Sequence, residues 1–400
     1  MSVSLRLMDT KNKIIHLKVF IMKVKFTIWG LLLLLLFSCK EVQQPDGNFL
    51  IKEAGIEAYE SNKLSEIIED FELIPLETRD DCLVGRISTI KKRCGHYYIY
   101  SQSTSTLLVF NEKGQFVAKI GNKGQGPGEY PLIEDFDADK EWVYILASEK
   151  ILVYKTNGKF LREIPVVNVK SGKFRRVKNG FLVASRTSLA DGNVLAYIND
   201  EGQFIKTALP FESYVISGHR ISWVKWKENI YIHQISESND LYAFDADSEE
   251  FYEMKLAKGN AYPSAKEFIE KKKAKEIFKV ASELTTSHTH LLWGESKGRE
   301  NASIFVQSKK NGKTRFFPML ENARAAIEDD ITFPESAKEM MMLGSLVRND
   351  SDDDSFTCYI DYFMIKEKAE EKGLLSTVPY NKLKDLPDDS NPVLVSLKFR

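Results

Sequence analysis

Short apolar runs separated by polar turns fill most of the chain, and the clearest example spans residues 106–130. An apolar run at 107–110 leads to a polar turn that ends in Gly114, and a second run follows at 115–120. Two short runs joined by a turn with glycine are typical of a β-hairpin, because glycine adopts the positive φ that such turns need. The pattern predicts strands as the main element of the fold.

Four weaker copies of this hairpin follow along the chain. The residues before the five turns are spaced by 44, 44, 46 and 63 positions, and they are Phe110, Tyr154, Ile198, Phe244 and Gln307. Further apolar runs lie between the hairpins, so each repeat holds several short strands. A period near 44 with several strands per unit is typical of the blades of a β-propeller, in which each sheet buries both faces only between two neighbours.

The two ends of the repeat region predict how the ring closes. An alternating run at 71–76 precedes the first hairpin, and an apolar run at 392–399 ends the chain. Pairing of these runs would remove exposed sheet edges and complete a sixth blade. We therefore expect an all-β fold, a six-bladed β-propeller with four-stranded antiparallel blades, closed by its N- and C-terminal strands.

The longest spacing contains an insertion. Ser264 and Glu267 form the pattern of a capping box before a segment rich in lysine and glutamate. We expect a short helical insertion in the fifth blade that ends near Glu276. Its basic run at 271–273 is interpreted as a solvated helix face rather than a partner site. Further on, the acidic run at 352–354 is expected to be an exposed loop.

The N-terminal region is predicted to be a targeting segment. Residues 26–37 form a 12-residue apolar run, with Lys23 and Lys25 before it and Ser38 and Cys39 after it. A helix that spans a bilayer needs about 20 apolar residues, so the run fits the core of a secretory signal peptide. An uncleaved anchor helix is the alternative.

The end of this segment, Leu-Phe-Ser-Cys at 36–39, resembles the lipobox of bacterial lipoproteins. The resemblance implies that Cys39 is lipidated, with acyl chains such as palmitate, and becomes the mature N-terminus. The predicted parts of the chain are a lipoprotein signal peptide at 1–39, with Met22 as an alternative start, a tether at 40–65 and one propeller domain at 66–400.

Composition adds two constraints. With 43% hydrophobic and 28% charged residues, the chain is typical of a globular protein, and its net charge of −1 offers no basic excess for nucleic acid. Beyond Cys39 the chain has Cys82, Cys94 and Cys358. In an oxidising compartment Cys82 and Cys94 could form a disulfide, and three unpaired thiols are an equal alternative.

Four segments resemble a known group, the six-bladed β-propeller lipoproteins of the bacterial envelope, which are related to NHL-type propellers. These segments lie at 71–77, 120–130, 329–334 and 391–395, and the glycine-rich second segment is the most specific. The resemblance implies a six-bladed ring and a location in the cell envelope, and we expect the lipoprotein to be anchored to the outer membrane. It implies no settled activity.

Three motifs invite a chemical interpretation but favour a structural one. The glycines within 121–128 lack the lysine, the serine or threonine and the helix of a phosphate loop, so we expect a corner between blades. His288 and His290 would share one strand face, but no third ligand is evident and no metal is predicted. Residues 135–139 alternate like a calcium loop without its glycine and glutamate, so we expect a strand with outward acids that ends in a turn.

Three tryptophans are the candidate ligand-binding residues. Trp223, Trp226 and Trp293 could stack on sugar rings or anchor a peptide. The alternative is that they pack between blades, as large aromatic residues in propellers often do.

No Ser-His-Asp pattern, nucleophile elbow or zinc-protease motif is present, so whether the chain is an enzyme stays open and no catalytic residue or cofactor is predicted. We expect a lipid-anchored envelope module that binds a glycan, a peptide or a partner lipoprotein. The alternatives are a metal-dependent propeller enzyme, of the lyase or lactone hydrolase type, with its site at the central channel, and an envelope assembly protein. Convergent acids and histidines at the channel entrance would favour the enzyme, and aromatic residues with arginines would favour binding.

Overall fold

The structure, a computed structural model, describes residues 56–58, 63–66, 68–167, 169, 172–211, 223–234, 238–256, 262–277, 279–281, 285–287, 289–297, 300–310, 312, 314–318, 332, 334 and 349–400. The chain divides into two compact units, Met1–Gln44 and Pro45–Arg400. The first unit lies outside the described residues, so the signal peptide at 1–39 and the lipidation of Cys39 stay predictions. Every described residue belongs to the second unit.

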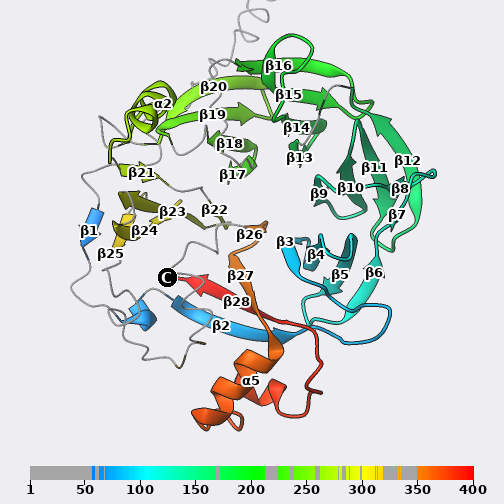
Figure 1. The fold of residues 1–400 in the computed structure, drawn as a ribbon, viewed down its shortest axis with the longest axis vertical. Helices are drawn as coiled ribbons and strands as arrows, with labels where there is room; N and C mark the ends of the chain where they lie inside the picture. The colour runs from blue at the N-terminus through cyan, green and yellow to red at the C-terminus, as the bar shows by residue number, and fades with distance from the viewer. Residues whose placement is uncertain are drawn as a thin grey trace, which may run out of the picture. The chain divides into compact units, whose positions relative to one another are not determined.

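The strands between residues 135 and 255 form three four-stranded antiparallel sheets (Figure 1). In each sheet the strands pair in chain order, so each sheet is a meander. The strands are β9 (Asp135–Ala138), β10 (Trp142–Ala147), β11 (Lys150–Lys155), β12 (Phe160–Pro165), β13 (Lys173–Val177), β14 (Gly180–Ala184), β15 (Asn193–Asn199), β16 (Phe204–Pro210), β17 (Trp223–Lys227), β18 (Ile230–Gln234), β19 (Asp240–Asp245) and β20 (Glu250–Lys255). This is the blade architecture that the repeat predicts.

Two further sheets complete the ring. One has 11 strands and joins the β3–β6 group to the β21–β25 group through β26, and the other has three strands in the order β2, β28, β27. A short parallel ladder pairs β7 with β8. The strands are β1 (Ile56–Ala58), β2 (Ile68–Pro75), β3 (Ile87–Arg93), β4 (His96–Ser101), β5 (Thr106–Asn111), β6 (Phe116–Lys119), β7 (Asn122–Lys123), β8 (Glu129–Tyr130), β21 (Lys279–Ala281), β22 (Thr285–Thr286), β23 (His290–Lys297), β24 (Glu300–Ser308), β25 (Thr314–Pro318), β26 (Asn349–Ser351), β27 (Ser355–Ile360) and β28 (Val393–Phe399).

The chain is an all-β propeller with four-stranded antiparallel blades, but the expected count of six blades was wrong. In the part of the chain that the structure describes there are five sheets besides the β7–β8 ladder. The reason is β26, because Asp350 pairs in parallel with Lys91 of β3 and with Thr286 of β22. This strand merges the β3–β6 group and the β21–β25 group into one sheet, and the closing sheet has three strands.

The predicted pairing of the chain ends is present. β2 lies antiparallel to β28, with Phe71 opposite Leu397. Strand β1, which falls within the segment expected to be a tether, pairs in parallel with β25. The strands of the domain therefore include residues upstream of position 66.

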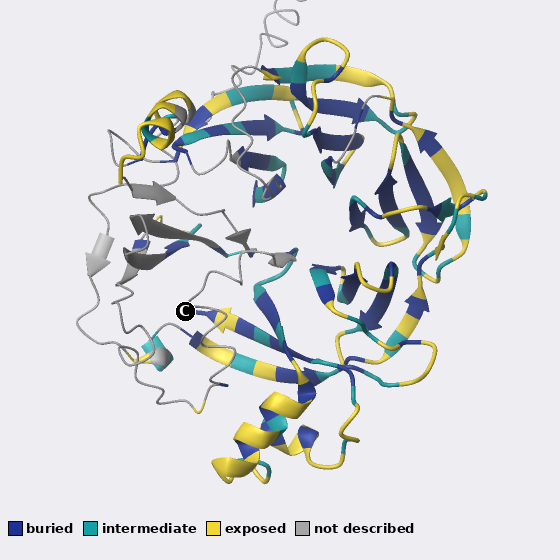
Figure 2. Cartoon of the chain, viewed as in Figure 1, coloured by how far each residue is buried: buried dark blue, intermediate teal, exposed yellow. Residues whose placement is uncertain are grey.

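Apolar side chains fill the layers between neighbouring sheets. Tyr98 and Val109 of the β3–β6 group share a buried cluster with Val143 and Leu152 of the β9–β12 sheet. Similar clusters join the β9–β12 and β13–β16 sheets, and the β13–β16 and β17–β20 sheets. Figure 2 shows buried residues on the inner strands and more exposed ones on outer strands such as β12 and β16. Each sheet thus hides its second face only by packing on its neighbour.

Glycines in the repeated turns allow a close approach between neighbouring sheets. Gly114 has a φ of 78°, and its N–H donates to the carbonyl oxygen of Asn111 at 2.9 Å. A Cβ at Gly114 would lie 2.2 Å from the backbone oxygen of Pro75, and one at Gly202 would lie 2.1 Å from that of Pro165. A side chain at either turn would push away the edge strand of the preceding sheet.

The glycine-rich run forms a corner between two sheets, which confirms the structural interpretation. It connects β6 to β9 through the β7–β8 ladder. The Tyr154 hydroxyl donates to the carbonyl oxygen of Gly128 at 2.6 Å, and the Tyr130 hydroxyl donates to that of Ile120 at 3.1 Å. Two buried tyrosines therefore fix the backbone of this corner.

Helix α2 (Ala265–Lys273) confirms the predicted insertion between β20 and β21. The Ser264 hydroxyl accepts from the N–H of Glu267 at 3.3 Å, and the Glu267 carboxylate accepts from the N–H of Ser264 at 2.8 Å. These two bonds are the expected capping box.

A second helix, α5 (Tyr362–Glu371), follows β27 and was not predicted. It buries Tyr362, Ile365 and Ala369 in a cluster with the closing sheet. Short 3-10 turns occur at η2 (Leu64–Glu66) and η5 (Tyr380–Leu383). None of the helices in the described ranges has the length and apolar character that crossing a bilayer requires.

Candidate functional site

Charged side chains of opposite sign face one another along the innermost strands of three neighbouring sheets. Figure 1 shows β3, β9 and β13 on the inner side of their sheets. Alternate residues of a strand share one face. The charged pairs on these strands are Lys91 and Arg93 on β3, Asp135 and Asp137 on β9, and Lys173 and Arg175 on β13.

Asp137 is at the centre of this network. Its Oδ1 accepts from Arg93 Nε at 2.7 Å, and its Oδ2 lies 3.5 Å from Arg175 Nε. The same Oδ2 accepts from the backbone N–H of Arg176 at 2.8 Å. The Asp137 side chain is 1% exposed. A carboxylate buried this deeply needs opposite charges and hydrogen bonds to replace water, and this site supplies both.

Asp135 is bound in a similar way. Its Oδ1 accepts from Lys91 Nζ at 2.9 Å and lies 3.8 Å from Lys173 Nζ, while its Oδ2 accepts from the N–H of Phe174 at 3.0 Å. The expectation of outward acids at 135–139 was therefore wrong for Asp135 and Asp137. All four residues of β9 are buried, because this innermost strand lies between β3 and β13.

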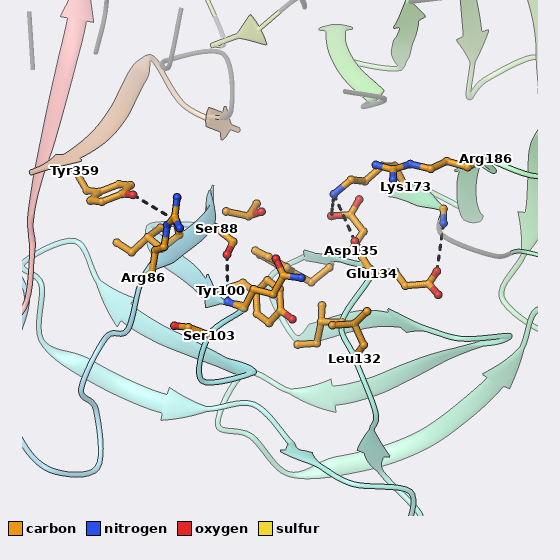
Figure 3. Close-up of a pocket in the computed structure, with 16 residues that line it drawn as sticks. Arg86, Ser88, Tyr100, Ser103, Leu132, Glu134, Asp135, Lys173, Arg186 and Tyr359 are labelled. Carbon is orange, nitrogen blue, oxygen red and sulfur yellow. Dashed lines mark hydrogen bonds and ion pairs between the residues drawn. The ribbon is translucent and has the colours of Figure 1, made fainter. Parts of the chain in front are cut away.

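A pocket of about 780 Å³ opens where β3, β9 and β13 begin (Figure 3). Its volume is within the range of roughly 300–1,000 Å³ that is typical of ligand sites. The lining comes from four sheets, and it comprises residues 86–89, Tyr100, residues 102–103, 132–136 and 172–173, Arg186 and Tyr359. The pocket therefore exists only when these sheets are assembled.

The charged groups of the pocket differ in what they contact. Asp135 binds Lys91, and the Glu134 carboxylate accepts from the N–H of Gly172 at 3.2 Å. Arg86 and Arg186 make no ion pair with the described residues. The Nε of Arg186 is buried and has no hydrogen-bond partner in that part of the chain. Leaving such a donor unpaired costs about 1–3 kcal/mol.

Tyr100 adds a second polar group to the pocket wall. The residue is 6% exposed, and its hydroxyl makes no hydrogen bond of good geometry within the described ranges. Burial raises the pKa of Tyr100, although the nearby backbone of Ile133 opposes the shift. The hydroxyl therefore stays protonated at neutral pH and is a hydrogen-bond donor.

Positive charge extends to the next inner strand. Burial, together with the neighbouring Arg175 and Arg93, lowers the pKa of Lys225 on β17, against the opposing effect of Glu228 and Asp352. Burial is the larger cause of this shift, and the two arginines add to it.

The acidic run at 352–354 is not the exposed loop that we expected. Each of its residues is half-buried, and Asp353 lies 2.5 Å from Lys92 Nζ. Asp352 accepts from the N–H of Cys94 at 2.8 Å. Proximity of β26 to β3 explains the difference, because the turn after β26 lies against buried cations of β3.

The structure places two of the three candidate tryptophans in packed layers rather than in the pocket. Trp223 is 3% exposed and contacts His233 and Phe251, and Trp226 is 6% exposed in the cluster that includes Phe305. Trp293 lies in β23, but its side chain is outside the described part. The geometry fits the packing alternative for Trp223 and Trp226, and a ligand role for the three stays a prediction.

The remaining candidates do not converge on a metal site. His288 lies outside the described residues, and His290 is buried with its Nδ1 2.9 Å from the Thr289 hydroxyl. No group of three or more His, Cys, Asp or Glu side chains in the described ranges could hold a metal ion. Cys82 and Cys94 are free thiols in the structure, which is the alternative without a disulfide.

The chain belongs to the family described as Domain of unknown function (DUF4934), whose model matches residues 50–398. The solved structures similar to it include a Bacteroides fragilis protein described as exported, with 17% identity, a TM-score of 0.61 and coverage of 86% of this chain and 98% of that chain. Another is a member of the DUF4221 family from Bacteroides vulgatus, with 10% identity, a TM-score of 0.46 and coverage of 85% and 99%.

A comparison with curated proteins found no match. The similarity to the Bacteroides fragilis protein supports the propeller fold, and at 17% identity it supports the fold alone.

Sequence reasoning missed the pocket residues, although one signal was present. Lys91 and Asp135 are 44 residues apart, and so are Arg93 and Asp137. This spacing equals the hairpin period, so opposite charges occupy equivalent positions in successive repeats. Arg86, Tyr100 and Arg186 carry no such signal, because their convergence depends on loops from different sheets.

Proposed function

We propose that this protein is a lipid-anchored binding module of the bacterial cell envelope that holds a polar ligand in the pocket where its innermost strands begin. The observation that carries the proposal is the pocket itself, where Arg86 and Arg186 meet the aromatic side chains of Tyr100 and Tyr359. Arginines and aromatic residues favour binding, whereas convergent acids and histidines would favour a metal-dependent enzyme.

The membrane part of the proposal rests on the sequence at 36–39 and on the resemblance to NHL-related envelope lipoproteins. The Bacteroides fragilis protein with this fold is described as exported, and the proposal places this chain in the envelope as well. The lipid on Cys39 would hold the propeller at the outer membrane, where its ligand is a glycan, a peptide or a partner lipoprotein. Two or more acyl chains suffice for stable anchoring.

The test of binding uses the full chain, extracted from membranes in detergent, on arrays of glycans and peptides. We expect reproducible binding by the native chain and loss of binding by Arg186→Gln. Arg162→Gln is the matched control, because Arg162 is exposed on the outer strand β12. Failure of the native chain on both arrays, or equal binding by Arg186→Gln, would contradict the proposal.

The test of anchoring uses Cys39→Ala. We expect the native chain to incorporate a palmitate analogue and to sediment with membranes, and the variant to do neither. Protease treatment of intact cells then shows on which side of the membrane the propeller lies. Equal labelling of both proteins would contradict lipidation at this residue.

A further inference from the structure

We infer that the pocket binds the anionic group of its ligand, a carboxylate or a phosphate, between Arg186 and Arg86. This inference rests on the proposed binding function and names the chemistry of the ligand. Its basis is the difference between cations that already have partners and cations that do not.

Arg186 is a cation of the pocket without an ion-pair partner among the described residues. Its side chain is half-buried, and its Nε is shielded from solvent without a hydrogen-bond acceptor in the described part of the chain. Figure 3 shows Arg186 on one side of the pocket and Arg86 on the other. A guanidinium presents several donors in a planar fork, which matches the oxygens of a carboxylate or phosphate. An anion in the pocket would give this guanidinium the counter-charge that the described residues do not supply.

The pocket also contains two carboxylates, which could have accepted hydrogen bonds from these arginines. Asp135 is already occupied by Lys91 Nζ at 2.9 Å and by the N–H of Phe174 at 3.0 Å. Glu134 Oε2 accepts from the N–H of Gly172 at 3.2 Å. Asp135 therefore neutralises Lys91, Glu134 binds a backbone N–H, and neither acid forms an ion pair with the two arginines in the described part of the chain.

Lys173 adds a further positive charge to the pocket. Its Nζ lies 3.8 Å from Asp135 Oδ1 and 3.4 Å from the carbonyl oxygen of Glu134, so its ion pair is a long one. The side chain keeps 26% of its surface exposed. Together with Arg86 and Arg186 it places three cations around one opening, against the two carboxylates of Glu134 and Asp135.

Tyr100 lines the same pocket, and its buried hydroxyl lacks a well-formed hydrogen bond in the described ranges. Because the phenol stays protonated, it can donate to an oxygen of the ligand beside the anionic group. The combination predicts a small polar ligand that carries one anionic group and further oxygen acceptors.

The experiment compares three probes with the same ring: glucuronate, glucose 6-phosphate and glucose. Their binding to the full chain in detergent is measured by titration calorimetry and by the shift in melting temperature at low salt. We expect at least one of the two anions to bind at least about tenfold more tightly than glucose, because hydrogen bonds to charged groups are the strong ones. The anion that binds more tightly identifies the carboxylate or the phosphate as the preferred group.

Variants assign the effect to the pocket. We expect Arg186→Gln and Arg86→Gln each to weaken anion binding by about tenfold or more, and Arg162→Gln to leave it unchanged. Arg86 is exposed, so its replacement keeps the inference testable if Arg186→Gln does not fold. Equal binding of glucose and the anions, no response to either anion, or native affinity in Arg86→Gln would overturn the inference. The array result for the native chain decides the proposed function separately.

Discussion

Leu73 of β2 lies opposite Val395 of β28, and both side chains are fully buried. The pair joins the first long strand of the propeller to the last strand of the chain. β28 is the middle strand of its sheet, since it also pairs with β27. Folding of the closing sheet therefore requires the C-terminal residues, and the ring is held by a contact between its two ends.

Replacing Leu73 tests this closure. We expect Leu73→Ala to lower the free energy of unfolding by about 2–5 kcal/mol, because it removes buried methyl groups and leaves a cavity against β28. Urea denaturation followed by circular dichroism measures the change. The matched control is Glu72→Ala on the same strand, where the exposed side chain predicts a change within about 0.5 kcal/mol. Equal effects of both variants would show that the closing sheet is not a packed part of the ring.

The turn glycines give a second prediction. Gly202→Ala and Gly192→Ala each place a Cβ on a residue with positive φ, 81° and 88° respectively, at a cost of about 1–2 kcal/mol. Only at Gly202 would the new Cβ meet the backbone of Pro165, whereas nothing lies within 4 Å at Gly192. We expect Gly202→Ala to be the less stable of the two by a further 1–3 kcal/mol or so. Similar melting temperatures for the two variants would contradict the close approach of the sheets.

How far the fold follows from the sequence depends on the range of each interaction. The hairpins, the capping box at Ser264 and the alternation within strands are local patterns, and the structure has them where the sequence predicts them. β26 has only three residues and pairs in parallel with two strands from distant parts of the chain. No local pattern marks such a pairing, and this is why the number of sheets was predicted wrongly.

The site follows from the sequence to a smaller degree. The acids at 135–139 were noticed for their alternation, but their burial became evident only from the position of β9 between β3 and β13. The 44-residue spacing from Lys91 to Asp135 would have predicted their ion pair. The unpartnered Nε of Arg186 could not be predicted from the sequence, because it depends on which residues lie around this side chain in the folded protein.

The buried ion pairs of β9 give a third prediction. Asp137→Asn removes the charge that compensates Arg93 and Arg175, whose side chains are 4% and 5% exposed. We expect a loss of about 3–5 kcal/mol in the free energy of unfolding, because two buried cations lose the counter-charge that Asp137 supplies. Glu250→Gln is the control, since its ion pair with Lys206 is exposed and should contribute less than about 1 kcal/mol. A loss in Asp137→Asn no larger than in the control would contradict the network.

Asp353 gives a prediction about pH. Although burial opposes the shift, the hydrogen bonds from Lys92, Ser355 and Ser351 lower the pKa of Asp353 below its usual value of 3.8. The folded state then binds this proton less readily than the unfolded chain does. The stabilisation is complete above pH 3.8 and is lost as the pH falls through the lowered pKa of the folded state. Since the side chain is 41% exposed, we expect a contribution of only about 0.5–1 kcal/mol at neutral pH.

The measurement is the difference in free energy of unfolding between the native chain and Asp353→Asn, followed from pH 7 down to strong acid. We expect Asp353→Asn to be less stable at pH 7 and the difference to shrink below pH 3.8, because the protonated native carboxyl then resembles the amide. Asp388→Asn serves as the control, since Asp388 pairs with Lys366 while its side chain is 83% exposed, and its difference should stay near zero throughout. A difference for Asp353→Asn that is constant across the range would show that the Lys92 contact does not depend on the carboxylate charge.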